Sequence, residues 1–340
     1  MGKNMANLDK DLEILAKSVL SGKKVTFFQG AGVSTSAGIP DFRSPDTGIY
    51  SNLARLNLPY PEAVFDIDYF RENPKAFYTL ADELFPGRFM PTKFHFLQKL
   101  FQDKKFLHRI YTQNIDTLER LAGIEDKYIV EAHGSFATNH CVECRAQMET
   151  SILKEHMKNE KLDGIPTCTH CKGYVKPDIV FFGEALPIKF FDQWEKDMDE
   201  VEVAIVAGTS LTVFPFASLP SEVKHNTTRV LVNKDKVGDF NSNKRRKDIV
   251  ALIEADKFAE TLAEKLGMKK ELDKLILHES KKYARQDGEV KESASKEATK
   301  VAKEVGEQEK GHIPSDKDSN QKPSNNEDEG IEQEILKLMI

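Results

Sequence analysis

The chain has 340 residues, of which 49 are basic and 55 acidic, so its net charge is −6. This balance argues against a surface whose main task is to neutralise nucleic-acid phosphates. No apolar run approaches the roughly 18 to 20 residues that a membrane span needs, and the N-terminal residues lack a signal-peptide core. We expect a cytoplasmic protein with access to the nucleus, and no contact with membrane or nucleic acid.

Short apolar runs alternate with helical patterns along most of the chain. Residues 9–20 have apolar side chains at helical spacing, and Gly22 supplies a stop. Four apolar runs are typical of buried strands that end at small or polar residues: 24–28, 106–111, 201–206 and 229–232. A helical pattern returns at 258–267. This order predicts an α/β fold with a doubly wound parallel sheet, whose ligands bind beyond the carboxyl ends of the strands.

Two stretches interrupt this rhythm, and we interpret both as modules inserted into the sheet domain. Residues 46–100, rich in aromatics and prolines, form a helical module, and residues 137–176 hold every cysteine. The sheet domain then comprises residues 1–45, 101–136 and 177–267.

The remaining C-terminal residues differ from the sheet domain in composition. Residues 268–280 continue as a helix, whereas 281–340 have too few large apolar side chains to offset the entropy of ordering them, which predicts a mostly disordered tail. Within 331–340, apolar residues stand at the spacing of a nuclear export signal. A short amphipathic helix that docks on its own domain needs the same face, so both interpretations stay open, and we predict export.

The four cysteines form two C-x2-C pairs separated by 23 residues, Cys141 with Cys144 and Cys168 with Cys171. Four thiolates complete a tetrahedral Zn²⁺ site and leave no position for a catalytic water, so we predict one structural zinc ion. Free buried thiols or a redox pair are the alternatives. Three nearby histidines could replace a thiolate: His140, His156 and His170.

Gly30-Ala31-Gly32 follows the first predicted strand directly, where glycines let the backbone approach a pyrophosphate. The usual third glycine is missing, because Thr35 stands in its place, so an ordinary tight turn is an equal alternative. His133, in a loop before glycine, could present its imidazole to a ligand, but a lone histidine proves little.

The run Lys244-Arg245-Arg246-Lys247 concentrates positive charge on four residues. It could be a nuclear import signal or a phosphate-binding patch. We favour a solvated basic loop.

Together these segments resemble the sirtuin family over about residues 20–265. Residues 30–43 are similar to its GAGxSxxxGIPDFR motif, residues 111–116 to TQNID, residues 133–134 to HG, and residues 206–210 to VxGTS. Three further segments are most similar to class I sirtuins of fungal and animal cytoplasm: 52–54, 58–65 and 176–184.

The resemblance implies a Rossmann-like large domain and a small domain made of the helical and zinc modules, with NAD and acyl-lysine meeting between them. The residues that it implies for NAD binding are Gly30, Ala31, Gly32, Val33, Ser34, Thr35, Asp41, Phe42, Arg43, Gln113, Asn114, Ile115, Asp116, Gly208, Thr209, Ser210, Asn233, Lys234, Asp235 and, as a less certain contact, Ala255. Those that it implies for acyl-lysine binding are Phe65, Ile179, Val180, Phe181, Phe182, Gly183 and Glu184, with 180–184 pairing like a strand with the substrate backbone.

The activity implied is NAD-dependent deacetylation of lysines in histones or other proteins, which yields nicotinamide, O-acyl-ADP-ribose and free lysine. The acyl oxygen attacks C1′ of the nicotinamide ribose, and His133 acts as general base toward the ribose hydroxyls. Asn114 and Asp116 fix the ribose and the amide. Phe42 shields the reacting carbon, and Arg43 meets phosphate charge.

One departure from the family concerns the acyl group. Members that prefer succinyl or malonyl lysine have a Tyr and an Arg where this chain has Ala81 and Leu84. The resemblance therefore implies neutral acyl groups. Three alternatives use the same segments differently: a protein mono-ADP-ribosyltransferase, a dehydrogenase, and an inactive NAD-sensing or zinc-ribbon adaptor.

Overall fold

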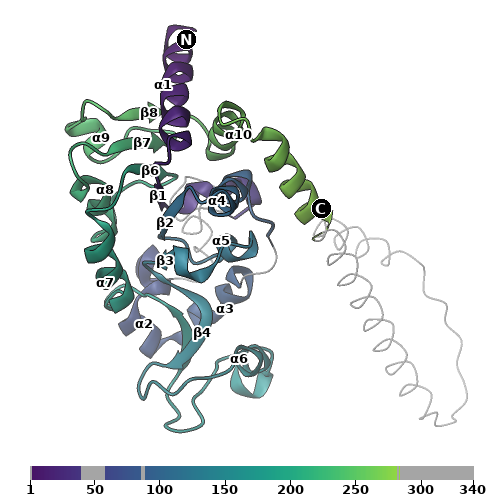
Figure 1. Ribbon diagram of the computed structural model, residues 1–340. Coiled ribbons are helices and arrows are strands. Elements are labelled where there is room, and N and C mark those ends of the chain that lie inside the picture. Colours follow the sequence, from purple (N-terminus) through teal and green to yellow (C-terminus); the bar gives the residue numbers. More distant parts are fainter. Residues whose placement is uncertain (1, 40–57, 86–88, 282, 284–340) are drawn as a thin grey trace, which may run out of the picture. The chain divides into compact units, whose positions relative to one another are not determined.

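The computed structural model describes residues 2–39, 58–85, 89–281 and 283 (Figure 1). Its main sheet has six parallel strands in the order β3-β2-β1-β6-β7-β8. The strands are β1 (Val25–Gln29), β2 (Leu107–Thr112), β3 (Ile129–Glu131), β6 (Val203–Ala207), β7 (Thr228–Val232) and β8 (Ile249–Ala251). The predicted doubly wound parallel sheet is confirmed: four of its strands match the four predicted runs, and the three-residue strands β3 and β8 complete it.

Successive side chains of a strand point to opposite faces of the sheet, and helices cover both faces. Both faces are therefore buried. Phe27 packs in one apolar cluster and Phe28 in another. Helices α1 (Gly2–Leu20), α4 (Lys93–Asp103) and α10 (Ala255–Lys265) contribute to the first cluster. Helices α7 (Ile188–Asp197) and α8 (Leu219–Glu222) contribute to the second, on the other side of the sheet (Figure 1). Residues 269–281 are also helical.

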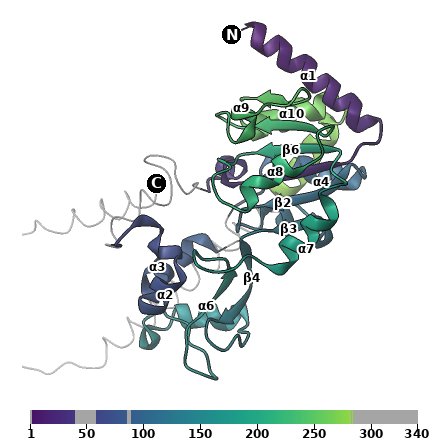
Figure 2. The ribbon, with the colours of Figure 1, turned by 90° about the vertical axis from the view of Figure 1, so that its left-hand side faces the viewer.

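A third apolar cluster joins the two inserted stretches into one small domain, the lower part of Figure 2. From the first stretch come η4 (Pro61–Phe65), α2 (Ile67–Glu72) and α3 (Pro74–Leu84). From the second come the antiparallel pair β4 (Gly134–Cys141) and β5 (Val175–Ile179), and α6 (Thr150–Met157). Asp66 caps α2, because its carboxylate accepts hydrogen bonds from the N–H groups of Asp68 and Tyr69. The predicted architecture of a sheet domain with a composite smaller domain is thus confirmed.

Helix α4 lies on the sheet, although the sequence places most of it in the helical module of residues 46–100. The ring of Phe94 meets that of Phe27 edge to face, with centroids 5.7 Å apart. Phe96 and Leu97 are fully buried in the same cluster. We propose that the helical part of the small domain ends before α4.

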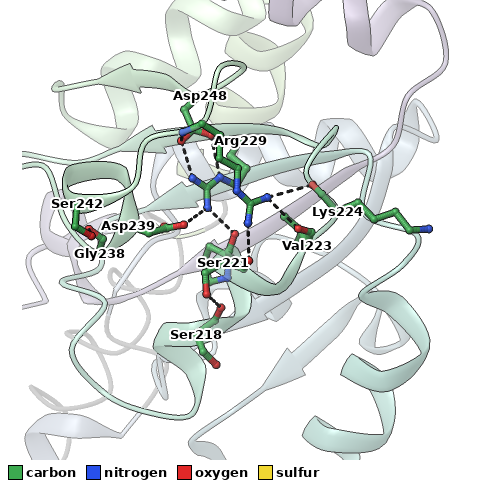
Figure 3. Close-up of polar contacts among 11 residues, drawn as sticks. Ser218, Ser221, Val223, Lys224, Arg229, Gly238, Asp239, Ser242 and Asp248 are labelled. Atoms are coloured by element: carbon green, nitrogen blue, oxygen red, sulfur yellow. Dashed lines mark hydrogen bonds and ion pairs between the residues drawn. The ribbon is translucent and has the colours of Figure 1, made fainter.

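A buried arginine organises the loops that follow β7 (Figure 3). Arg229 is fully buried; its guanidinium donates to both carboxylate oxygens of Asp248, at 2.9 and 2.6 Å, and pairs with Asp239 of α9 (Asp239–Ser242). The ring of Phe240 lies 4.5 Å from it. Removing one partner of such a pair costs about 3–5 kcal/mol, since the other charge stays buried. The cluster fixes the chain between β7 and β8, part of which reaches the active site.

The basic run 244–247 is not a uniformly solvated loop, which corrects our interpretation. Arg245 donates hydrogen bonds to the carbonyls of Ser221, Val223 and Lys224, at 2.5, 2.9 and 3.1 Å, and so joins the loop to the end of α8. Lys244, Arg246 and Lys247 are exposed.

The described helices include none that is both long and apolar enough to cross a membrane.

Candidate active site

A cavity of about 710 Å³ opens where the carboxyl ends of the parallel strands meet the small domain. Such an edge is where α/β sheets bind ligands. The predicted site residues that line it are Gly30, Ala31, Gly32, Thr35, Phe65, Gln113, Asn114, Ile115, His133, Ile179, Val180, Phe181, Phe182, Gly183, Glu184, Gly208, Thr209, Ser210, Asn233, Lys234, Asp235 and Ala255. One cavity therefore gathers segments that are up to 225 positions apart in the chain, from residue 30 to residue 255.

The glycine turn after β1 packs directly against the loop after β6. The N–H of Gly32 donates to the carbonyl of Gly208 at 2.8 Å. A Cβ added at Gly32 would stand 2.7 Å from the Gly208 Cα, which is closer than any side chain tolerates. Gly30 and Gly32 therefore allow the two loops to touch.

Behind this turn, a chain of side-chain hydrogen bonds fixes the loop after β2. The Asn114 amide donates to the Ser34 hydroxyl at 3.2 Å, and Ser34 donates to the Asp116 carboxylate at 2.6 Å. Asp116 also accepts from the N–H of Leu118 at 3.0 Å. Asn114 lines the cavity, whereas Asp116, Ser34 and the buried Val33 stand behind its surface. Burial raises the pKa of Asp116.

A second buried carboxyl group, Glu119 of α5 (Leu118–Leu121), lies beneath the same loop. It accepts a hydrogen bond from the Gln29 amide at 2.6 Å and another from the Thr112 hydroxyl. Thr112 in turn accepts from the N–H of Asn114 at 3.1 Å. Burial, reinforced by the charge of Asp116, raises the pKa of Glu119 to about 8. The carboxyl group therefore ties β1, β2 and α5 together below the site.

His133 stands at the junction of β3 and β4 and is one of the residues that line the cavity. Its Nδ1 is 3.0 Å from the carbonyl oxygen of Gln113. A carbonyl only accepts, so Nδ1 carries the proton, and Nε2 keeps a lone pair. Burial lowers the pKa of His133, and the bond with Gln113 opposes the shift in part. The ring is thus held neutral in the tautomer that a general base requires.

Three strand-end loops are locked to one another by polar side chains. The Thr209 hydroxyl donates to the Gln113 side-chain oxygen at 2.7 Å, and the Asn233 amide donates to the Thr209 carbonyl at 3.2 Å. The loops after β2, β6 and β7 therefore form one surface whose parts cannot move independently without breaking these bonds.

The segment 179–184 forms the opposite wall, and its backbone already pairs with the protein. The N–H of Val180 donates to the His133 carbonyl at 2.8 Å, and that of Phe182 to the Phe65 carbonyl at 2.7 Å. The Phe182 carbonyl accepts from the N–H of Ile67 at 3.0 Å. The N–H groups of Val180 and Phe182 and the carbonyl of Phe182 therefore already have partners within the protein.

The four cysteines converge between β4 and β5. Their sulfur atoms all lie within 4.8 Å of one another, and the Cys141–Cys171 and Cys144–Cys168 pairs are 3.4 and 3.6 Å apart. A tetrahedron with Zn–S bonds of about 2.3 Å has edges of about 3.8 Å, so the set fits zinc.

The histidines near the cysteines have other surroundings. His140 pairs with Asp178 at 2.7 Å, His170 is exposed, and none of the three joins the sulfur cluster. The four cysteines thus form a set that could hold a structural zinc ion without them.

Comparison with known proteins decides the family. The Sir2 family model matches residues 30–215. The chain is 64% identical over 281 residues to the NAD-dependent protein deacetylase HST2 of Candida albicans, covering 83% of this chain and 84% of that protein. The chain belongs to the Sir2 family. It is also 46% identical to NAD-dependent protein deacetylase sirtuin-2 of Danio rerio, over 88% of this chain and 83% of the relative. With sirtuin-3 of Mus musculus the identity is 45%, over 78% of each.

Some predicted residues of this Sir2-family chain lie elsewhere. Asp41, Phe42 and Arg43 fall outside the described residues. Ala81 and Leu84 pack in or against the core of the small domain, and neither is among the described residues that line the cavity.

Several lining residues escaped sequence analysis: Leu186, Val213, Phe214, Val232, Val237, Ile253 and Glu254. Ile253 and Glu254 follow β8, whose three residues are too few to show a pattern. Phe214 follows the strand-end loop after β6, and only the structure shows that its large apolar ring is 71% exposed. The others adjoin predicted segments and carry no further signal.

The first prediction concerns zinc. Removing it with a chelator should unfold the small domain of this Sir2-family protein, because structural zinc sites contribute about 10 kcal/mol or more to folding. Amides of β4 and β5 should then exchange rapidly, while the fluorescence of Trp194, buried in the sheet domain, changes less. Adding zinc back should restore protection. A metal-free chain that still protects β4 and β5 would refute the structural role.

Proposed function

We propose that the protein is an NAD-dependent deacetylase of lysine side chains in other proteins. The observation that carries this proposal is His133, whose Nδ1 donates to the Gln113 carbonyl and which lines the same cavity as the glycine turn and the segment 179–184. The relatives named above are NAD-dependent protein deacetylases, which supports the same activity.

The cavity as a whole has a volume of about 710 Å³, which suits a large ligand. Its sheet side fits NAD in chemistry. The glycine turn and Thr35 would hold the phosphates, and the carboxylate of Asp235 can accept from ribose hydroxyls. We assign NAD binding to the predicted residues that line this side, Ala255 included. When bound, NAD supplies an electrophilic ribose carbon, C1′, and nicotinamide as leaving group.

The acyl-lysine would enter along the opposite, apolar wall. Phe65 and Ile179 are nearly buried, and Phe182 is 44% exposed on the same cavity. An apolar channel excludes water and favours a neutral acyl group over one with an extra carboxylate, which would be buried without a cationic partner. Val180 to Glu184 would grip the substrate backbone with the groups that the fold leaves unused.

The polar residues would then divide the chemical work. Nε2 of His133 would accept a proton from a ribose hydroxyl, which makes that oxygen nucleophilic. Asn114 would hold the ribose and amide from the cavity wall, while Asp116 would act from behind, through Ser34. The four cysteines would take no part in the reaction. They would hold zinc and keep the small domain folded.

Mass spectrometry of an acetylated peptide tests the activity. Incubation with the enzyme and NAD should remove the acetyl group and yield nicotinamide and O-acetyl-ADP-ribose, and without NAD the peptide should stay unchanged. An ADP-ribose adduct on protein would instead indicate a transferase. A peptide that stays acetylated with NAD present would overturn the proposal.

The pH profile of kcat/KM tests His133. Protonated histidine cannot accept a proton, so activity should fall as the pH drops through the pKa of His133. Because burial lowers this pKa below the ordinary 6.5, the midpoint should lie below pH 6.5. His133→Ala should reduce kcat by about 10²- to 10⁴-fold, and exposed His225→Ala should not. Full activity in His133→Ala would contradict the assignment.

The finer assignments of partner and compartment rest on sequence. We propose histones among the substrates, and binding of residues 331–340 to a nuclear export receptor, which would keep the enzyme cytoplasmic with access to the nucleus. The support is the apolar spacing at 331, 335, 338 and 340, which lies outside the described residues. Deleting residues 330–340 should raise the nuclear fraction seen by microscopy, and an unchanged distribution would count against export.

A further inference from the structure

A lysine that sequence analysis did not single out lies buried beneath the substrate wall. Lys176, on β5, has a side chain only 4% exposed. Its ammonium is 2.9 Å from the Glu184 carboxylate and donates to the Ile179 carbonyl at 2.7 Å and the Pro177 carbonyl at 3.2 Å. The ring of Phe181 lies 4.4 Å from the same nitrogen. A buried ammonium is tolerated only with such partners.

Glu184 closes this arrangement from the other end of the segment. The carboxylate oxygen that meets Lys176 also accepts from the N–H of Phe181 at 2.8 Å, and the Glu184 N–H donates to the Phe181 carbonyl at 3.0 Å. Residues 176–184 therefore wrap around one positive charge. Gly183, at φ +88°, permits the turn that brings Glu184 back.

Electrostatics agrees with this geometry. Burial lowers the pKa of Lys176, and the carboxylate of Glu184 opposes the shift most strongly, followed by that of Asp178. Among the neighbouring groups, Glu184 therefore favours the charged form of Lys176 most strongly. The pairing occupies the Glu184 side chain, whereas sequence analysis expects residues 180–184 to pair with the substrate through their backbone.

The wrapped segment is the one that lines the acyl-lysine side of the cavity. On its other side it is already fixed by the bonds from Val180 to His133 and from Phe182 to Phe65. The Lys176 ammonium supplies the remaining restraint from below. We propose that Lys176 is a positioning residue for the acylated substrate: through Glu184 it sets the shape of segment 179–184, and so the affinity for acyl-lysine peptide. This inference rests on the proposed deacetylase function.

A role in substrate positioning differs from a general structural role in what it changes. NAD meets the loops after β1, β2, β6 and β7, none of which contacts Lys176 through the bonds above. Loss of the ion pair should therefore weaken peptide binding and leave NAD binding nearly unchanged. A merely structural lysine would, on removal, lower thermal stability and affect both ligands alike.

The experiment uses the full-length, zinc-loaded chain with Lys176→Met and Glu184→Gln, alone and together. We expect Lys176→Met to raise the KM for acetylated peptide, and the Kd of a fluorescent acetylated peptide measured by anisotropy, about tenfold. The KM for NAD and kcat should change less than about twofold. Because the two residues act as one unit, the double variant should be no weaker than the weaker single variant. Lys196→Met, at an exposed lysine of α7, is the matched control.

The outcomes separate the two levels of the account. If the wild-type chain does not deacetylate, the proposed function fails. If the wild type is active and Lys176→Met keeps the wild-type peptide Kd, the inference fails. Equal losses for peptide and NAD, or additive effects in the double variant, also overturn it. Should Lys176→Met not fold, Glu184→Gln decides alone: an unchanged peptide Kd refutes positioning, and a tenfold rise with unchanged NAD KM supports it.

Discussion

Parallel pairing of the strands brings the carboxyl ends of β1, β2, β6, β7 and β8 to one edge of the sheet. The loops that follow must then share a small space, and the close contact of Gly32 with Gly208 shows how tightly they do so. This crowding brings His133, Asn114 and the glycine turn together around a single cavity.

The small domain completes the site, because it supplies a wall that the sheet cannot provide. Ile179 and Phe181 belong to its apolar core, yet the same segment lines the cavity. Two kinds of contact therefore hold this wall in place: packing in the core of the small domain, and hydrogen bonds to the carbonyls of His133 and Phe65. A zinc ion held by the four cysteines would act on this arrangement indirectly, by joining the end of β4 to the segment that precedes β5.

The sequence predicts the parts of this molecule that depend on neighbouring residues. Strand ends, the glycine turn and the paired cysteines are visible as local patterns, and four of the strands agree with the structure to within about two residues. What the sequence hides are pairings across long distances. Gln29 and Glu119 are 90 positions apart, and nothing near Glu119 distinguishes a buried carboxyl group from a solvated one on a short helix. Arg245 belongs to a basic run, and the carbonyl groups that bind it lie 21 to 24 positions earlier in the chain, where no local pattern reveals them.

The central claim is that one crevice holds NAD and acyl-lysine together, and amide hydrogen exchange tests it most directly. With NAD and an acetylated peptide both bound, exchange should slow in residues 30–35, 113–116 and 208–210, and in the peptide-facing segment 179–184. NAD alone should protect the first three segments. Protection by NAD at another edge of the sheet, or a peptide that leaves 179–184 unprotected, would contradict the account.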